Sequence, residues 1–339
     1  MEFRTLEFTG HGLRLLDQTR LPQTVQYVDC HTPSDVYQAI RTLVVRGAPA
    51  IGVAAGYAMA LAVKGKAFSS TNDVAKALEN TAAYLKSARP TAVNLAWAVG
   101  RMLAVVRQHV ADHPEQVICL LEAEAARIED EDRQMCRKIG EHGEPLVPNG
   151  AAILTHCNAG ALAAAGIGTA LAVIYVAHER GKKIKVYADE TRPLRQGARL
   201  TTWELQQQGI DVTLICDTVP GALFCAEKID LVIVGADRIV RNGDVANKIG
   251  TYQLAVLAEK HRVPFYVAAP ESTIDRSLFS GNEIPIEERS PEEVLSTGGL
   301  AIAPHGISVY NPAFDVTPNE LITAIITDAG IWQGGRWGR

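Results

Sequence analysis

The sequence predicts an α/β protein in two parts: a mainly helical N-terminal domain with a small antiparallel sheet, then a Rossmann-like domain on a doubly wound parallel sheet. Three observations support this prediction. Residues 34–139 have mostly helical periodicity. After residue 150, short apolar runs alternate with helical stretches. The stretch HGEPLVPNG, which has no periodicity, separates these two sequence patterns. We expect domains at 1–141 and 151–331, a linker at 142–150 and a frayed tail at 332–339.

The first thirty residues alternate apolar and polar side chains between turn signals. Residues 13–17 and 24–28 have the pattern of short antiparallel strands. Gly, Pro or polar residues interrupt the periodicity that follows, which predicts helices at 34–45, 49–64, 71–87, 91–109 and 115–139. The last helix carries the acidic run Glu129–Asp132, which is typical of a solvated face and less so of a metal cluster.

The second domain alternates strand and helix regularly enough to predict parallel βαβ units. Strands are expected at 151–157, 184–189, 211–217, 231–237, 265–270 and 307–310. Helices are expected at 167–180, 195–208, 221–227, 246–261 and 318–328. Residues 271–300 lack periodicity and are predicted to form a loop over one end of the sheet.

Composition narrows the class of protein. The 339 residues carry a net charge of −5, which argues against a nucleic-acid partner. No basic, apolar leader opens the chain, and no run reaches the roughly 18 apolar residues of a membrane span, so we expect a cytoplasmic protein without a membrane partner. The six cysteines form no CxxC pair, which favours reduced thiols over a disulfide framework or a zinc site.

Candidate catalytic residues follow the predicted strands, because ligands of parallel sheets bind beyond the carboxyl ends of the strands. Cys157 follows the first strand and Asp237 follows the fourth, and a thiol and a carboxylate at neighbouring strand ends can act as an acid/base pair. Asn247 and Lys248 are expected to open the next helix beside them. Asp237 could instead cap a turn, and Cys157 could be a small buried hydrophobe.

Two predicted helix starts in the first domain carry arginines. Arg46 precedes Gly47-Ala48-Pro49, and Arg89 precedes the helix expected from residue 91. Free amides at a helix start together with a guanidinium bind phosphate or carboxylate. With Gln196 and Lys248 from the second domain, they predict an anion cleft between the domains. The alternative is that each arginine is a solvated charge.

Other chemistries fit less well. His156 adjoins Cys157 on a strand and should face the opposite side, which argues against a Cys–His hydrolase. The turn CNAGALAAAGIGTA lacks the G-x-G-x-x-G spacing of dinucleotide sites, although Asp189 ends the next strand as a ribose-binding acid would. No P-loop motif occurs.

At these motifs the sequence resembles the methylthioribose-1-phosphate isomerases, a family shared with the regulatory α, β and δ subunits of translation initiation factor 2B. The matching stretches run from about residue 40 to 331 and include VRGAPAIGVAAGYAMAL, ARPTAVNLAWA, LTHCNAGALAAAGIGTAL, VYADETRPLRQGARLTTWEL, DLVIVGADRIVRNGDVANKIGTYQLAVLA, PFYVAAP and YNPAFDVTPNELITAIITDAGI.

The resemblance implies a homodimeric isomerase that converts 5-methylthioribose 1-phosphate to 5-methylthioribulose 1-phosphate without a metal or an organic cofactor. The catalytic cysteine and aspartate of the family fall on Cys157 and Asp237. Its contacts to the phosphate and the sugar fall on Arg46, Gly47, Ala48, Arg89, Gln196, Asn247 and Lys248.

For this reaction we expect Asp237 to act as the acid at ring opening, with a pKa raised by desolvation beside its apolar strand. Cys157 would act as base at C2 or stabilise developing charge. The alternatives are an isomerase of 5-deoxyribose 1-phosphate or ribose 1,5-bisphosphate, and a non-catalytic regulatory subunit. The chain shows no cationic surplus beyond Arg46, Arg89 and Lys248, which favours an apolar C5 substituent.

Overall fold

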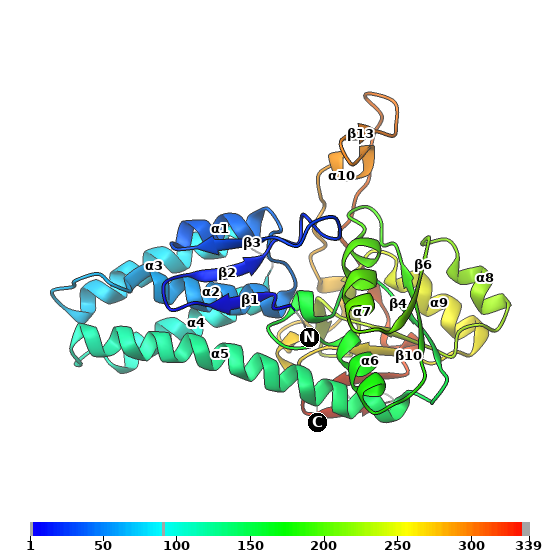
Figure 1. The fold of residues 1–339 in the computed structure, drawn as a ribbon, viewed down its shortest axis with the longest axis horizontal. Coiled ribbons are helices and arrows are strands. Elements are labelled where there is room, and N and C mark those ends of the chain that lie inside the picture. Colours follow the sequence, from blue (N-terminus) through cyan, green and yellow to red (C-terminus); the bar gives the residue numbers. More distant parts are fainter. Residues whose placement is uncertain (1–2, 90–91, 334–339) are drawn as a thin grey trace. The chain divides into compact units, whose positions relative to one another are not determined.

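The computed structural model describes residues 3–89 and 92–333 (Figure 1). The chain forms two compact units. The first contains the residues up to Arg137 and the segment Gly160–Gly168, and the second contains Lys138–Ala159 and the chain from Thr169 onward. This differs from the expected division, because helix α5 (Pro114–Gly143) extends without a break into the expected linker at 142–150, and a segment beyond that linker returns to the first unit.

The first unit has the expected antiparallel sheet and helices. The sheet has the order β1 (Leu6–Phe8), β2 (Leu13–Leu16), β3 (Tyr27–Cys30). The helices are α1 (Pro33–Arg41), α2 (Ala48–Val63), α3 (Thr71–Ala88), α4 (Val93–Gln108) and the first part of α5. Helix α2 is apolar on every side and buried from Ala50 to Val63, so the other helices of the unit pack around it.

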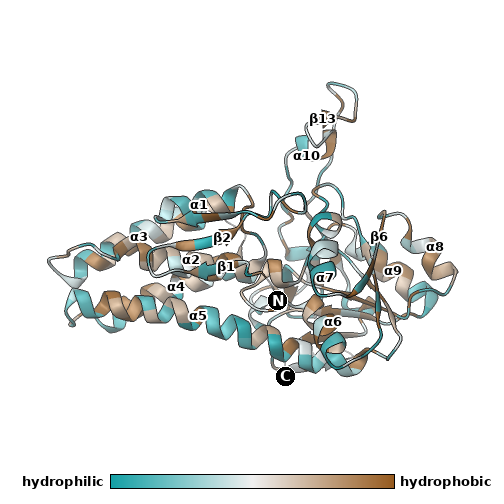
Figure 2. Cartoon of the chain, in the orientation of Figure 1, coloured by the Kyte–Doolittle hydropathy of each residue, from teal (hydrophilic) through white to brown (hydrophobic). Residues whose placement is uncertain are grey.

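Helix α5 is amphipathic, with hydrophilic residues along much of the side seen in Figure 2. Its acidic run was predicted to be a solvated face, and this is wrong for Asp132. That side chain is buried, and its carboxylate accepts the backbone N–H groups of Ala165 and Gly166. Burial raises the pKa of Asp132 to about 6. The run therefore contributes one residue that holds the segment Gly160–Gly168 within the first unit.

The second unit contains the predicted doubly wound sheet (Figure 1). The strand order is β16-β15-β10-β7-β4-β5-β6, and all pairs are parallel except β15–β16. The strands are β4 (Ala152–Thr155), β5 (Lys185–Asp189), β6 (Asp211–Ile215), β7 (Leu231–Val234), β10 (Phe265–Ala268), β15 (Ala324–Thr327) and β16 (Gly330–Gln333).

Helices cover both faces of this sheet. Helices α6 (Ala170–Glu179) and α7 (Thr202–Gln207) lie on one side, and α8 (Pro220–Cys225) and α9 (Thr251–His261) lie on the other. Strands β7 and β10 are buried along their whole length, which explains why they are continuous apolar runs. Val232 and Val234 share a core cluster with Leu254 of α9.

A second, smaller sheet was not predicted. Its order is β11 (Ile274–Asp275), β8 (Arg238–Val240), β9 (Val245–Lys248) and β14 (Phe314–Thr317). Strands β8 and β9 form a hairpin around Asn242-Gly243, a turn sequence that favours antiparallel pairing. Asn247 and Lys248 therefore lie on a strand, and the helix expected to begin there begins at Thr251 instead.

Two predictions near the C-terminus are wrong. Residues 318–328 form a short 3-10 turn, Asn319–Leu321, followed by strand β15, instead of a helix. Residues 307–310 form no strand, and Ile307 and Tyr310 are exposed there. In the expected tail, Trp332 and Gln333 belong to β16, and the remainder lies outside the described residues.

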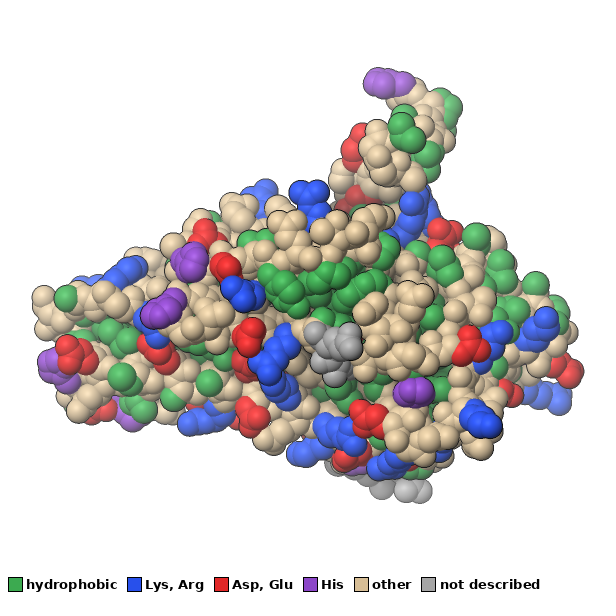
Figure 3. All heavy atoms as spheres, viewed as in Figure 1, with side chains coloured by type: hydrophobic (Ala, Val, Ile, Leu, Met, Phe, Trp, Pro, Cys, Tyr) green, Lys and Arg blue, Asp and Glu red, His purple; other side chains and the backbone are tan. Residues whose placement is uncertain are grey.

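The expected loop 271–300 is part of a longer segment that projects from the second unit (Figure 1). It carries α10 (Glu292–Leu295) and the hairpin of β12 (Ser296–Thr297) and β13 (Leu300–Ala301). We call residues 286–310 the arm. Figure 3 shows hydrophobic side chains on its surface, and Leu300 and Tyr310 are 73% and 81% exposed. Among the described residues, no helix combines the length and apolar character needed to cross a membrane.

Candidate active site

The order of the strands places the candidate site at the carboxyl ends of β4 and β7. Strand β4 pairs with β5 on one side and with β7 on the other, so the chain reverses its direction of winding beside β4. Crevices for ligands form at such switch points. Cys157 comes two residues after β4, and Asp237 comes three residues after β7. The two predicted catalytic residues thus follow neighbouring strands on either side of the switch point.

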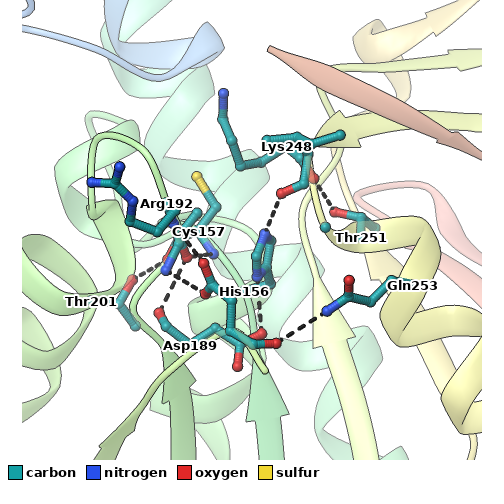
Figure 4. Close-up of polar contacts among 12 residues, drawn as sticks. His156, Cys157, Asp189, Arg192, Thr201, Lys248, Thr251 and Gln253 are labelled. Carbon is teal, nitrogen blue, oxygen red and sulfur yellow. Dashed lines mark hydrogen bonds and ion pairs between the residues drawn. The ribbon is translucent and has the colours of Figure 1, made fainter. Parts of the chain in front are cut away.

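A close approach of two backbones fixes this edge of the sheet. Gly235 directly follows β7, and a Cβ atom there would lie 2.8 Å from the Cβ of Ala159. Only glycine leaves room for the loop after β4 to lie against the end of β7. The backbone of Cys157 has a φ of 62°, a left-handed conformation that L-residues other than Asn, Asp and His seldom adopt. In Figure 4 its sulfur points away from the strands.

His156 and Asp189 form a buried pair beneath Cys157. The His156 Nδ1 lies 3.0 Å from the Asp189 carboxylate, and its Nε2 lies 2.9 Å from the carbonyl oxygen of Ile249 (Figure 4). Burial raises the pKa of Asp189 to about 6, although His156 partly offsets this. Burial lowers the pKa of His156, but the hydrogen bond and charge of Asp189 outweigh it, so the net shift is upward. Both ring nitrogens are used, which leaves neither for a Cys–His pair.

His156, Asp189 and Asp217 offer ligand atoms within 4.8 Å of one another, a grouping that can hold a metal ion. Contacts within the protein occupy most of these ligand atoms, although Oδ1 of Asp189 is buried without a hydrogen-bond partner. The Asp217 carboxylate accepts the backbone N–H groups of Thr191 and Arg192, both at 2.7 Å. Asp189 is buried against His156 and is not exposed as a ribose-binding acid would be. The cluster therefore acts as an internal support for the loop at the end of β5.

Asn247 and Lys248 lie on β9, and both are buried. The Lys248 ammonium donates to the Ala313 carbonyl at 2.7 Å and lies 4.8 Å from the centre of the Phe314 ring. Figure 4 shows this side chain and the Cys157 thiol pointing to the same side, away from the strands. His156 precedes Cys157 in the sequence, and Ile249 follows Lys248. The hydrogen bond from His156 to the Ile249 carbonyl therefore links the backbone beside Cys157 to the backbone beside Lys248.

Asp237 lies at the start of the β8–β9 hairpin. Its backbone N–H donates to the carbonyl of Ala246 at 3.0 Å, and this hydrogen bond places Asp237 beside the residue that precedes Asn247. The residue is exposed, in contrast to the desolvation expected from the apolar strand before it. The strand buries its own side chains, but the carboxylate follows two small residues and has left the core.

Gln196 is a candidate that the structure places in the second unit close to Asp189. Its side chain is buried, and its amide oxygen accepts no hydrogen bond. Gly197, its neighbour, lies against the Asp189 carbonyl oxygen. Buried polar atoms in proteins nearly always have a partner, so an oxygen without one is suited to a donor from a bound ligand.

The remaining candidates belong to the first unit. Gly47 is the N-cap of α2 and Ala48 is its first residue, so the predicted helix start is confirmed, with Arg46 directly before it. Arg89 is the C-cap of α3 and does not open the next helix. Residue 91, where that helix was expected to begin, lies outside the described residues, and the helix is observed from Val93.

Two buried threonines at the site were not identified from the sequence. Thr191 accepts the N–H of Cys157, and the Thr201 hydroxyl lies 2.5 Å from the Cys157 carbonyl oxygen (Figure 4). Thr191 stands at the end of β5, and the rule for strand ends could have selected it. Thr201 lies in a π-helical turn, Gly197–Thr201, for which the sequence gives no comparable signal.

A family model described as the initiation factor 2 subunit family matches residues 44–334. The chain belongs to this family. A relative from Desulforamulus reducens, named methylthioribose-1-phosphate isomerase, is 54% identical over 322 residues, which cover 95% of this chain and 93% of the relative.

Two solved structures share the fold of this member of the initiation factor 2 subunit family. One is 5-methylthioribose 1-phosphate isomerase from Pyrococcus horikoshii, with a TM-score of 0.92 and 46% identity over 97% of this chain and 92% of that one. The other is described as the delta subunit of translation initiation factor eIF-2B from A. fulgidus, with a TM-score of 0.88 and 45% identity over 97% and 96%. The predicted fold and family are confirmed.

Proposed function

We propose that this chain is an aldose–ketose isomerase that converts 5-methylthio-D-ribose 1-phosphate to 5-methylthio-D-ribulose 1-phosphate in methionine salvage. The observation that carries the proposal is the 54% identity, over nearly the full length of both chains, to the relative of that name. The positions of Cys157 and Asp237 at two neighbouring strand ends support it, because this reaction needs two groups that exchange protons with one substrate.

The reaction begins with a closed ring, because phosphate on the anomeric oxygen prevents spontaneous opening. In the proposed mechanism Asp237, as the neutral acid, protonates the ring oxygen while the C1–O bond to it breaks. The exposed carboxylate needs the bound substrate to exclude water from it, since burial is what raises the pKa of a carboxyl group.

The second step moves hydrogen from C2 to C1. Cys157, as the thiolate, removes the proton from C2 of the opened sugar to give an enol phosphate. The Cys157 thiol then delivers a proton to C1 while the C2 hydroxyl gives its proton to the Asp237 carboxylate, which yields the ketose and restores both groups. A direct hydride shift from C2 to C1 is the alternative, with Cys157 stabilising the charge that develops. Arg46, Gly47, Ala48, Arg89, Gln196, Asn247 and Lys248 are proposed to bind the phosphate and the sugar.

The test is an assay of the purified protein with 5-methylthioribose 1-phosphate in heavy water, with ketose formation followed by NMR. Asp237→Asn should lower kcat by about 10²–10⁴-fold, the usual contribution of a general acid or base. Cys157→Ser should lower it too, since a hydroxyl is a much weaker acid than a thiol. Deuterium at C1 of the product would favour proton exchange, and its absence would favour a hydride shift.

Matched controls come from the same sheet. Cys216 follows β6 and is exposed, and Asp211 is exposed at the start of the same strand. Cys216→Ser and Asp211→Asn should keep the kcat of the unaltered protein. An Asp237→Asn protein that turns over at the normal rate would remove Asp237 from the mechanism.

Two other substrates belong in the assay, 5-deoxyribose 1-phosphate and ribose 1,5-bisphosphate. The second carries an additional phosphate at C5, and the resemblance assigns only Arg46, Arg89 and Lys248 as cations that contact the substrate, so we expect it to react more slowly. The similarity to the structure described as an initiation factor subunit favours the second candidate function, a regulatory subunit without activity. Failure of all three substrates to react would support that candidate.

We also propose that the protein is a cytoplasmic homodimer. Six cysteines without a disulfide fit a reducing compartment. Exposed apolar residues on the arm, Leu300, Ile302 and Tyr310, offer area that a second copy could cover. Light scattering of the purified protein tests this, and a mass of one chain at micromolar concentration would contradict it.

A further inference from the structure

The backbone of Cys157 is held at both of its polar groups by side chains from other parts of the chain. Its N–H donates to the Thr191 hydroxyl oxygen at 2.9 Å. Its carbonyl oxygen accepts from the Thr201 hydroxyl at 2.5 Å. Both threonines are fully buried, and Cys157 itself has the left-handed φ of 62°. We name Thr191 and Thr201 the threonine clamp.

We propose that the threonine clamp positions the thiol of Cys157 for catalysis by holding this residue in its left-handed conformation. Thr191 and Thr201 are then positioning residues that act through the backbone of Cys157. The proposal rests on the proposed function for its kinetic readout.

The direction of each hydrogen bond in the clamp is fixed by its neighbours. The Asn158 side-chain nitrogen lies 3.2 Å from the Thr201 oxygen and can only donate, so the Thr201 proton is free to go to the Cys157 carbonyl. The Thr191 oxygen accepts from Cys157 and donates its own proton to the Asp189 carbonyl at 3.1 Å. Each hydroxyl thus donates once and accepts once, and no other rotation satisfies the same partners.

The elements that carry the clamp are themselves held. The N–H of Thr191 donates to the Asp217 carboxylate, and Thr191 also has a left-handed φ, of 63°. Asn158 donates to the buried carboxylate of Glu204, which also accepts from Tyr175. These contacts connect the ends of β4, β5 and β6 to helices α6 and α7, so the clamp is anchored on five separate elements.

The π-helical turn explains how Thr201 reaches Cys157. In this turn the N–H of Thr202 donates to the Gly197 carbonyl, five residues earlier. The additional residue changes which side chain faces β4, and such insertions often occur at functional sites. The hydroxyl of Thr202, the next residue, instead donates to the Ala198 carbonyl of the same π-helical turn, at 2.6 Å. Of these two adjacent threonines, only Thr201 donates its hydroxyl to the backbone of Cys157, so Thr202 serves as a matched control.

The left-handed conformation determines where the thiol points. A residue that continued β4 in extended form would direct its side chain to the face opposite His156. In the left-handed form Cys157 turns its sulfur away from the strands (Figure 4). Such conformations persist only where the surroundings impose them, and at active sites they are often part of preorganisation. Without a clamp contact the Cys157 peptide can turn and displace the sulfur.

The experiment replaces each hydroxyl by a methyl group of the same size. Thr201→Val and Thr191→Val should each lower kcat by about 10²-fold with little change in KM, because misplacement of a reacting group by about 1 Å has that effect. Thr201→Ser restores the hydroxyl and should recover most of kcat. Thr202→Val should leave kcat unchanged. A normal kcat in both valine variants of the clamp, or no recovery with serine, would overturn the proposal.

A second measurement does not depend on isomerase activity. The rate at which iodoacetamide alkylates Cys157 is followed by peptide mass spectrometry, which separates it from the exposed Cys119, Cys216 and Cys225. Release of the clamp should increase that rate several-fold in Thr201→Val and Thr191→Val, and leave it unchanged in Thr202→Val. Equal rates in all proteins would overturn the clamp even if the unaltered protein lacked isomerase activity, an outcome that would refute only the proposed function. If Thr201→Val does not fold, Thr191→Val and Thr201→Ser decide the question.

Discussion

The buried pair of His156 and Asp189 predicts a specific dependence of stability on pH. The two side chains are 2% and 1% exposed. The Ile249 carbonyl can only accept, so Nε2 of His156 carries a proton. A second proton lies between Nδ1 and the Asp189 carboxylate. Its loss would leave two acceptors 3.0 Å apart without water, which is costly in a buried site.

The pKa of His156 is raised above its ordinary value of 6.5, because Asp189 outweighs the effect of burial. Above pH 6.5 the folded protein therefore keeps a proton that the unfolded chain has released. The stabilisation is complete below that pH and is lost as pH rises through the folded pKa. One proton changes the free energy of unfolding by at most about 1.4 kcal/mol per pH unit, or about 2 kcal/mol between pH 6.5 and 8.

Asp189→Asn removes this titration and keeps the shape of the side chain, because the amide can donate to Nδ1 of neutral His156. Urea unfolding of both proteins at pH 6.5, 7.25 and 8, followed by circular dichroism, measures the difference. The unaltered protein should lose stability relative to Asp189→Asn across that range, by no more than about 2 kcal/mol. Asp211→Asn, at an exposed position, should follow the unaltered protein. Parallel pH curves for the unaltered protein and Asp189→Asn would refute the reasoning.

Three further predictions test the packing and the charges of the two units. Gly47→Ala should lower the free energy of unfolding, measured by thermal unfolding, by about 3 kcal/mol, because φ is 90° and the new Cβ would lie 2.5 Å from the Cα of Ala163. Gly65→Ala is the control: φ is 68° but the space around it is open, so it should lose only the conformational part, about 1–2 kcal/mol. Lys248→Met should raise KM for the sugar phosphate at least about tenfold, the effect of roughly 1.4 kcal/mol in binding, and an unchanged KM in steady-state kinetics would contradict its role. Tyr175→Phe should destabilise the protein by about 1–3 kcal/mol in urea, since it removes a donor from the buried Glu204 carboxylate, whereas Tyr252→Phe, at an exposed position, should not.

The helices of the first unit, and the alternation of strands and helices in the second, could be predicted because the sequence patterns that indicate them extend over many residues. Helix α2 is a run of apolar residues that begins at Gly-Ala-Pro, and the parallel strands β4, β5, β6, β7 and β10 lie in short runs rich in apolar residues that each precede a polar strand end. These patterns depend on burial averaged over many residues, so small local errors do not change the result.

The errors occur where local propensity and tertiary packing disagree. Ala324–Thr327 lies in a segment with helix-like spacing, but its β-branched Ile325, Ile326 and Thr327 fit a buried strand, and β10 and β16 provide partners on its two sides. Asn247 and Lys248 precede a real helix, so a helix start was a natural inference. The Asn242-Gly243 turn upstream was the better signal, because it fixes a hairpin whose second strand includes both residues.

In the candidate site, the order of the strands determines the positions of some residues, and the number of residues in a helical turn determines the position of another. Cys157 and Asp237 could be selected because the carboxyl ends of parallel strands meet at one edge, whatever the separation in sequence. Thr201 depends on a different property, the number of residues in one turn of the segment before α7. An ordinary α-helical turn there would present another side chain to Cys157, although the sheet, the loop after β4 and every residue type would be the same. The position of the thiol thus depends on a backbone detail that leaves no periodic trace in the sequence, and the proteins most informative about it are those in which that turn alone is altered.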